Sequence, residues 1–313
     1  MDQGSSELKI MSSQFRADTR HGHACVPKRC TPVCRHGTRH ERAMSLELEG
    51  KAQKLRDLFQ SMGRVLVAFS GGVDSTLLLK VAQDTLGDGN VLAVTAHSPL
   101  YPERELTGVK KLVRILGARH RLIESNELEI PGFSKNPPNR CYHCKRKLFG
   151  ELLEVAKEEG ISFIVEGSTL DDDKDHRPGR VAVQELGIRS PLKETSFTKM
   201  EVRELSKELE LPTWDKPSLA CLASRFPYGE EIDEQGLRMV DEAEDFLFGL
   251  GFKQVRVRHY GNLARIEILK EEMARLIDGP LREKVADRLK EIGYRYVTLD
   301  LQGFRSGSMN EVL

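Results

Sequence analysis

The stretch Ser70–Ser75, which reads SGGVDS, decides the fold of this 313-residue chain. It follows the apolar segment Arg64–Ser70 (RVLVAFS), which predicts a buried strand, and it precedes an apolar helical pattern over Thr76–Leu86. Gly71 and Gly72 allow the backbone to approach a phosphate with no Cβ in the way. The first turn of the following helix would direct unpaired N–H groups at that anion. The stretch therefore predicts a phosphate-binding loop between a strand and a helix.

The other side chains of this loop indicate how it would bind phosphates. Ser70 and Ser75 supply hydroxyl donors on either side of Val73. Asp74 would repel a phosphate, so we expect it to act through a Mg²⁺ ion that bridges the phosphates. The chain has no G-x-x-x-x-G-K-[ST] motif and no G-x-G-x-x-G motif after the first strand. This argues against a γ-phosphate hydrolase and against dinucleotide redox chemistry. The alternative is an ordinary glycine turn with an Asp or Ser cap.

Outside this loop, strand patterns alternate with helix patterns. The spacing of Leu55, Leu58, Phe59 and Met62 predicts an amphipathic helix before the first strand. Further strands are predicted at Val91–Ala96, Arg121–Ile123 and Phe163–Glu166, and further helices at Glu103–Leu116, Lys145–Glu159 and Lys199–Glu210. This alternation predicts an α/β fold, with a parallel sheet covered by helices on both faces.

The pattern changes after about residue 230. A helix is predicted over Glu234–Leu250, and Gln254–Tyr260 and Leu263–Leu269 then alternate with period two around Gly261–Asn262, as in a hairpin. Two more helices and a strand over Tyr294–Leu301 complete a smaller α+β domain. We therefore expect an ATP-binding domain at 44–229 and a substrate-binding or oligomerisation domain at 230–313.

Residues 1–43 differ from the rest of the chain. They contain eight Lys and Arg against four Asp and Glu, together with four of the nine histidines, and they show no helical or strand period. We expect a disordered extension. A small zinc site is the alternative, although its spacing fits no standard finger. Its candidate ligands are Cys25, Cys30, Cys34, His36 and His40.

The overall composition limits the partners and the location. Lys plus Arg and Asp plus Glu both total 48, so no net charge draws the chain to nucleic acid or to an anionic membrane. No apolar run approaches the ~20 residues of a membrane helix. We expect a cytoplasmic protein that binds neither membrane nor nucleic acid. In a reducing compartment its six cysteines would serve metal binding, redox chemistry or catalysis rather than disulfides.

Three cysteines lie in the part of the chain that is expected to be ordered: Cys141, Cys144 and Cys221. The first two form a C-x-x-C pair, and the basic residues around it, Arg140 and Lys145–Lys147, should favour thiolates. The residues alone leave four interpretations open: ordinary helix-start residues, zinc bound with His143, a redox pair, or an iron–sulfur cluster. Of the two metal sites, zinc is the one that the residues alone favour.

The loop sequence resembles the pyrophosphate-loop ATPases, which include GMP synthetase, NAD synthetase, asparagine synthetase and the tRNA-thiolating enzymes. This superfamily cleaves ATP between the α- and β-phosphates, and AMP is transferred to the substrate. Further stretches narrow the resemblance to the LarE family of ATP-dependent sulfur transferases, which help to build the nickel-pincer nucleotide cofactor. They are NRCYHCKRKLF (139–149), EGSTLDDDKDHRPG (166–179), RSPL (189–192), KPSLACLASRFPYG (216–229), VRVR (255–258), ARIE (264–267) and YRYVTLDLQGFRSG (294–307).

The resemblance covers residue 44 to the C-terminus and implies a reaction. A carboxylate of pyridinium-3,5-biscarboxylate mononucleotide is adenylated and converted to a thiocarboxylate, and a second round gives the dithio product. The rival interpretations are an ammonia-using ligase of the NAD synthetase type and a tRNA-thiolating enzyme. Ammonia chemistry does not need the three cysteines. RNA binding would call for a basic surface, whereas residues 44–313 carry 40 Lys and Arg against 44 Asp and Glu. A homo-oligomer is expected.

The resemblance also bears on the sulfur source. Some members donate sulfur from a cysteine that is destroyed in the process, and that position here is Ala220, one before Cys221. Other members carry three cysteines placed like these and hold a [4Fe–4S] cluster. The resemblance thus implies a cluster at Cys141, Cys144 and Cys221, with Cys221 at the catalytic centre. Three thiolates leave one iron open, which could bind a sulfide supplied directly or by a cysteine desulfurase.

Other residues are candidates for the binding sites. Ala96 and Gly167 end predicted parallel strands, where such folds bind nucleotides, and are assigned to the adenosine pocket. Arg256 and Arg258 share one strand face, which suits a substrate phosphate. The alternative is two exposed strand arginines. The family motifs add Arg225, as a catalytic and substrate-binding residue, with Arg305, Glu244, Asp175 and Arg177. Glu244 would orient an arginine. For Asp171–Asp175, a solvated acidic loop is the alternative.

Overall fold

The computed structural model describes residues 39–174, 178–218, 220–305, 307–308 and 311, with side chains from residue 46 onward except those of residues 173 and 174. Contacts group Ala43–Leu313 into one compact unit. Helix α1 (Arg39–Met62) buries a stripe that includes Leu55 and Phe59, as their spacing predicts. Residues 39–43, which were expected to be disordered, are thus helical. The candidate zinc ligands of the extension lie outside the described side chains.

The first sheet has four parallel strands, in the order β3-β2-β1-β4. They are β1 (Val65–Ala68), β2 (Val91–His97), β3 (His120–Glu124) and β4 (Phe163–Val165). β1 pairs with β2 on one side and with β4 on the other, so the strand order reverses at β1. Such a switch point is where open parallel sheets bind ligands. The predicted α/β fold is confirmed.

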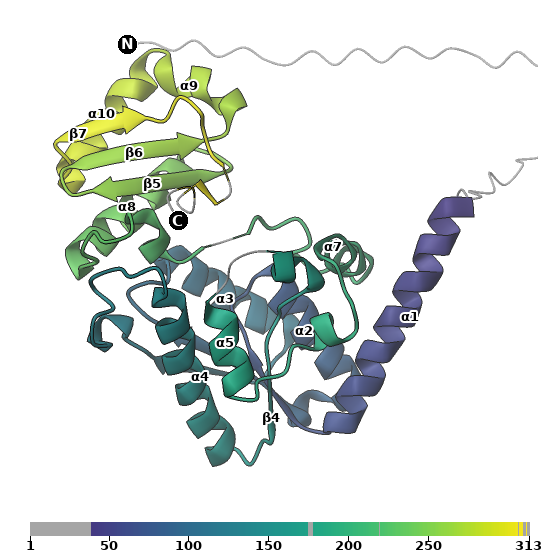
Figure 1. The fold of residues 1–313 in the computed structure, drawn as a ribbon. Coiled ribbons are helices and arrows are strands. Elements are labelled where there is room, and N and C mark those ends of the chain that lie inside the picture. Colours follow the sequence, from purple (N-terminus) through teal and green to yellow (C-terminus); the bar gives the residue numbers. More distant parts are fainter. Residues whose placement is uncertain (1–38, 175–177, 219, 306, 309–310, 312–313) are drawn as a thin grey trace, which may run out of the picture. The chain divides into compact units, whose positions relative to one another are not determined.

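Helices cover both faces of this sheet (Figure 1). One face, with Val65 and Val67, packs against α1, α2 (Val73–Leu86), α3 (Glu103–Leu116) and α7 (Lys199–Glu208). The other face, with Leu66, packs against α4 (Arg140–Glu158) and α5 (Gly179–Glu185). The short α6 (Pro191–Glu194) lies between α5 and α7 in the sequence. Successive residues of one strand therefore serve two separate cores, as in a doubly covered sheet.

The second sheet is formed by β5 (Val255–Tyr260), β6 (Leu263–Ile268) and β7 (Tyr296–Leu299). β5 and β6 form the expected antiparallel hairpin, and β7 joins β6 in parallel. The helices are α8 (Glu234–Gly249), α9 (Met273–Ile277) and α10 (Pro280–Ile292), which with the sheet enclose a separate apolar core (Figure 1). The smaller C-terminal α+β sheet is thus present, while the boundary at residue 230 stays a prediction.

Two helix starts differ from the sequence analysis in ways that matter for the site. α2 begins at Val73 rather than Thr76, so Asp74 lies in its first turn. α4 begins at Arg140 rather than Lys145, which places Cys141 and Cys144 on the first turns of a helix. Among the helices that the structure describes, none has both the length and the apolar character that a bilayer crossing needs.

Candidate functional site

The phosphate-binding loop joins the end of β1 to the start of α2. Gly71 has φ +65°, and a Cβ there would lie 2.8 Å from Val109 Cγ2. Glycine is therefore required both by the backbone conformation and by packing against α3. Ser70 Oγ and Ser75 Oγ are 3.2 Å apart across the loop, and Ser75 Oγ also donates to Gly72 O at 3.2 Å. The loop residues that the sequence singled out thus come together in one tight turn.

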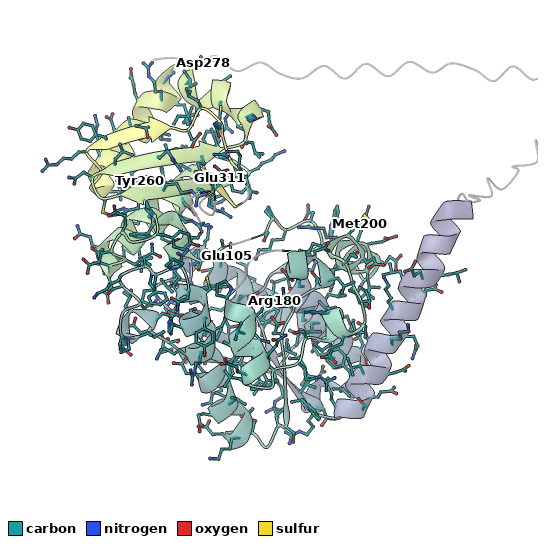
Figure 2. All side chains as sticks on the ribbon, viewed as in Figure 1. Glu105, Arg180, Met200, Tyr260, Asp278 and Glu311 are labelled. Carbon is teal, nitrogen blue, oxygen red and sulfur yellow. The ribbon has the colours of Figure 1, made fainter. Side chains whose placement is uncertain are left out.

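Two side chains that sequence reasoning missed hold the carbonyl groups of this loop. The Tyr101 hydroxyl donates to Ser70 O at 2.7 Å, and Lys216 Nζ donates to Gly71 O at 2.9 Å. Lys216 also pairs with Glu105 at 2.8 Å, a buried carboxylate on α3 that is labelled in Figure 2. Fixing both carbonyls fixes the peptide planes of the loop. Lys216 lies within KPSLACLASRFPYG, so the sequence contained a signal for it.

Asp74 faces Lys199, the first residue of α7, and the two form an ion pair. Burial raises the pKa of the Asp74 carboxyl, against the attraction of Lys199. Asp74 Oδ1 is buried and has no hydrogen-bond partner among the described residues. A carboxylate with one unused oxygen suits a Mg²⁺ ion, which in nucleotide sites takes one or two carboxylates and completes its shell with phosphates and water.

Two cavities meet at the loop, and we call them the polar cavity and the apolar cavity. The polar cavity, of about 520 Å³, is lined by Ser70, Asp74 and Gly167, among other residues. A Cβ at Gly167 would lie 3.0 Å from Asp74 Cβ and 3.2 Å from Ser75 N, so glycine lets this turn approach the loop closely. The apolar cavity, of about 220 Å³, is lined by Ala96 and by Ser70 from the loop. Ala96 and Gly167 thus each line a space beside the loop.

Two of the three cysteines lie at the apolar cavity. Cys144 and Cys221 line it, and Cys144 Sγ donates to Glu127 Oε1 at 3.8 Å. Burial raises the pKa of the Cys144 thiol, and the negative charges of Glu127, Cys221 and Cys141 raise it further. Cys141 is therefore close enough to act electrostatically on Cys144. In the described part of the chain, no three His, Cys, Asp or Glu side chains stand ready to coordinate a metal ion.

The basic residues around the C-x-x-C pair do not produce the expected effect on Cys144. Arg140 is buried and donates to Asn136 Oδ1 at 2.8 Å, while Lys145 pairs with Glu166 at 3.7 Å and Lys147 with Glu151 at 2.9 Å. The carboxylates of Glu166 and Glu151 offset the charges of Lys145 and Lys147. These two lysines therefore do not outweigh burial, which raises the pKa of the Cys144 thiol. The prediction that this pair is biased toward thiolates is wrong for Cys144.

Arg256 and Arg258 are both 5 % exposed, so the alternative of two exposed strand arginines is wrong. Arg258 makes a bidentate pair with Glu267 at 2.9 and 2.7 Å. Arg256 donates to Val255 O at 2.7 Å and to Ser218 O at 3.3 Å. Burial lowers the pKa of Arg256 to about 10, with the charge of Arg225 contributing. Arg258 is thus neutralised from within the protein, whereas Arg256 keeps a positive charge that an anion could meet.

Arg225 is fully buried and pairs with Glu244 through two 2.8 Å hydrogen bonds. Its Nη1 donates to Ala220 O at 2.7 Å and to Cys221 O at 2.8 Å. Although burial opposes it, Arg225 holds the pKa of Glu244 below its usual value. Glu244 orients Arg225, and Arg225 in turn holds the backbone that carries Cys221. Arg225 thus positions this backbone, and its predicted contact with a ligand stays a prediction.

The remaining candidates are placed less centrally. Arg305 is partly exposed and pairs with Glu311, which is labelled in Figure 2. Asp175 and Arg177 lie outside the described residues. Asp171 and Asp172 line the polar cavity and so lie beside the loop rather than on a remote solvated turn. Lys199, Lys216, Tyr101 and Glu127 are the residues that sequence reasoning missed.

Comparisons with known proteins agree with this geometry. A family model described as NAD synthase matches residues 49–133, which contain the loop. The chain is 45% identical to an uncharacterised protein of Synechocystis, over 85% of this chain and 99% of the relative. It is 39% identical to a pyridinium-3,5-bisthiocarboxylic acid mononucleotide synthase of Lactiplantibacillus plantarum, over 85% of this chain and 96% of the relative. A tRNA-specific 2-thiouridylase of a Thermoanaerobacter species is 28% identical over about half of each chain, 49% of this one and 53% of the relative. The chain therefore belongs to the pyridinium-3,5-bisthiocarboxylic acid mononucleotide synthase (LarE) family, a group of ATP-dependent sulfur transferases with a pyrophosphate-loop domain.

Proposed function

We propose that this chain makes pyridinium-3,5-bisthiocarboxylic acid mononucleotide, the product in the name of its Lactiplantibacillus relative, from the corresponding biscarboxylate. The observation that carries the proposal is the apolar cavity, which Ser70 of the phosphate-binding loop lines together with Cys144 and Cys221. A third cavity, of about 180 Å³, brings Gly72, Asp74, Ala220 and Cys221 together. Adenylation and sulfur delivery would thus take place beside each other.

The first half of the reaction is adenylation. A carboxylate oxygen of the substrate attacks the α-phosphorus of ATP, the bond to the β-phosphate oxygen breaks, and pyrophosphate leaves. The first turn of α2, together with Gly71 and Gly72, is suited to hold that pyrophosphate through backbone N–H groups. Lys199 reaches the same polar cavity and can add its charge. Asp74 would hold Mg²⁺, which would offset the charge that develops on the phosphates.

The second half replaces AMP by sulfur. Sulfide attacks the carbonyl carbon of the acyl-adenylate, the bond to the phosphate oxygen breaks, and AMP leaves with that oxygen. We assign Cys141, Cys144 and Cys221 to a [4Fe–4S] cluster, which would supply an iron position for that sulfide. The donor set fits a cluster in its chemistry, because it offers three thiols and those of Cys141 and Cys221 lie close enough to act electrostatically on Cys144. Ala220 leaves no thiol at the position of the sacrificial cysteine.

The mononucleotide phosphate has a candidate place near Arg256. A cavity of about 250 Å³ is lined by four basic side chains, those of Arg104, Lys216, Lys253 and Arg256, together with Glu105 and three further residues. Because Arg256 has, among the described residues, no bidentate acidic partner of the kind that Arg258 has, it can contribute a charge-assisted hydrogen bond to an anion. Arg305 is kept as a peripheral candidate. We assign substrate binding to residues 230–313, and oligomerisation to the same part.

The test is to incubate the purified chain with ATP, Mg²⁺ and the biscarboxylate mononucleotide, first without and then with sulfide. Without sulfide, substrate-dependent exchange of labelled pyrophosphate into ATP is expected. With sulfide, AMP, pyrophosphate and a thiocarboxylate identified by mass spectrometry should appear. Products limited to ADP and phosphate would refute adenylation. An amide formed with ammonia in place of sulfide would indicate a ligase of the NAD synthetase type.

A further inference from the structure

Lys216 contacts the phosphate-binding loop and also lines the cavity of about 250 Å³ that contains Arg256, which we call the basic cavity. Its Nζ donates to Gly71 O at 2.9 Å and pairs with Glu105 at 2.8 Å. The side chains of Lys216 and Glu105 are both largely buried. One ammonium group therefore lies at the loop that would bind ATP and at the cavity proposed for the mononucleotide phosphate.

The bond to Gly71 O determines where the loop directs its next N–H group. A trans peptide is planar, so the Gly71 carbonyl and the Gly72 N–H of the same peptide point in opposite directions. Because this peptide has glycine on both sides, the backbone itself restrains its orientation little. Lys216 thus helps to fix the direction of the Gly72 N–H, which is one of the donors that would meet pyrophosphate.

Lys216 can bind an anion in addition to these contacts. An ammonium group has three N–H donors. Among the described residues, that of Lys216 faces two acceptors, Gly71 O and the Glu105 carboxylate. The backbone of Lys216 is held by Arg203, whose Nη2 donates to Lys216 O at 2.7 Å. The side chain therefore extends from an anchored backbone, and its third donor can serve a ligand in the basic cavity.

The other side chains of the basic cavity suit a phosphate. Glu105 is the acidic residue that lines it, and Lys216 offsets that charge. Arg104 also lines it and pairs with two carboxylates of α8, at 3.6 and 3.5 Å. Lys253 and Arg256 add two further positive charges. An anion that enters this cavity would therefore meet basic side chains, of which Lys216 is the one that reaches the loop.

We propose that Lys216 couples the two substrates: it donates to the mononucleotide phosphate and to Gly71 O at once, so that each substrate increases the affinity of the other. This inference rests on the proposed function. A bound phosphate would hold Lys216 in place, and Lys216 would hold the Gly72 N–H toward the pyrophosphate. ATP would then meet an ordered loop, and bound ATP would favour the mononucleotide to the same degree. Repulsion between the two anionic substrates alone would give the opposite sign.

The test uses α,β-methylene-ATP, which cannot be cleaved between the α- and β-phosphates. Its affinity is measured by calorimetric titration with and without saturating biscarboxylate mononucleotide. In wild type this affinity should rise at least roughly five-fold when the mononucleotide is bound. The corresponding nucleoside, which lacks the phosphate, should give no increase at saturation. Lys216→Met should abolish the increase. Lys253→Met removes a charge from the same cavity and leaves the bond to Gly71 O in place, so it should lower mononucleotide affinity and keep the increase.

A second variant separates coupling from the loss of an ion pair. Lys216→Met leaves the buried Glu105 carboxylate without this partner, whereas Lys216→Met combined with Glu105→Gln removes both charges. The double variant should also show no increase, and its melting temperature checks that it is folded. An increase that persists in both Lys216 variants, or a decrease in wild type, would overturn the proposal. Mononucleotide binding to wild type without any increase would contradict this inference alone. If wild type did not bind the mononucleotide, the substrate assigned under the proposed function would fail as well.

Discussion

Lys199 and Asp74, 125 residues apart in the sequence, form an ion pair between the first turns of α7 and α2. The ammonium group of Lys199 pairs with Asp74 Oδ2, while Oδ1 has no hydrogen-bond partner among the described residues. The proposed Mg²⁺ ion would bind at Oδ1, and its charge would weaken the attraction between Asp74 and Lys199. Lys199 lines the same polar cavity, so it would then be available to the phosphates.

Asp74→Asn should abolish most of the pyrophosphate exchange and leave the fold intact. The amide keeps the shape of the side chain and removes the charge that Mg²⁺ needs. Because a metal ion contributes several kcal/mol to such a reaction, exchange should fall at least roughly a hundred-fold. Circular dichroism provides the control for folding. Exchange at the wild-type rate would show that Asp74 has no part in holding Mg²⁺.

The same substitution should change how stability depends on pH. The pKa of Asp74 is raised above its usual value, mainly by burial. The stability linked to this group is therefore present below the usual carboxyl pKa and is lost as the pH rises through the raised value. Asp74→Asn cannot ionise, so its stability relative to wild type should increase as the pH rises through this window. Melting temperatures measured across the window test this, and a constant difference would contradict the burial argument.

The Arg225–Glu244 pair should be strongly coupled in stability. Both side chains are fully buried, so removing either one leaves a buried charge without its partner. Arg225→Ala and Glu244→Ala should each cost about 3–5 kcal/mol, and the double variant should cost much less than their sum. Denaturant unfolding measures this cycle. The exposed pair of Arg121 and Glu158, at 2.7 Å, is the control and should couple by less than about 1 kcal/mol.

Arg256→Ala and Arg258→Ala should have different effects. Arg258→Ala leaves the buried Glu267 with only Arg265 among the described residues, so it should mainly destabilise the protein. Arg256 is a buried cation with a lowered pKa, and it lines the cavity proposed for the mononucleotide phosphate. Arg256→Ala should therefore mainly weaken binding of the mononucleotide. A lost charge-assisted contact is worth about 1.5–3 kcal/mol, so this affinity should fall roughly ten- to a hundred-fold. Calorimetric titrations with the mononucleotide and with ATP, beside thermal unfolding, measure both effects. An equal loss of ATP affinity would remove Arg256 from the substrate site.

The sequence predicted those parts of the site that depend on local pattern. SGGVDS between an apolar strand and a helix is a short-range signal, and the loop forms where that signal places it. The sequence pattern places the start of α4 too late, because the polar run around Cys141 hides the apolar period. Asn139, at the N-cap, makes no side-chain cap that would mark the start of the helix. The burial of Arg258 depends on strand register, which places Glu267 within reach across the hairpin. The partner of Asp74 is 125 residues away in the sequence, and that of Cys144 is 17 residues away in another element, so only tertiary structure reveals them.

Each of Cys141→Ser, Cys144→Ser and Cys221→Ser should abolish thiolation and spare adenylation. The phosphate-binding loop is built without these thiols, so pyrophosphate exchange should continue at near the wild-type rate. Anaerobic wild type should contain about four irons, and each variant should contain fewer. Ala220→Ser, at the exposed position before Cys221, is the matched control, because it adds a hydroxyl without removing a thiol and should keep both iron and thiolation. Thiolation at the wild-type rate by any of the three cysteine variants would remove that thiol from the centre.

The fate of Cys221 separates the cluster from a sacrificial thiol. With excess sulfide, one wild-type molecule should complete several turnovers while Cys221 keeps its mass, because a ligand is not consumed. A sacrificial thiol would give one sulfur per chain and leave dehydroalanine, which is lighter than cysteine by one H₂S. Intact-protein mass spectrometry after the reaction measures this directly, and peptide mapping assigns the position. Dehydroalanine at Cys221 would refute the cluster as the sulfur source, and the pyrophosphate exchange of the same sample would show whether adenylation still stands.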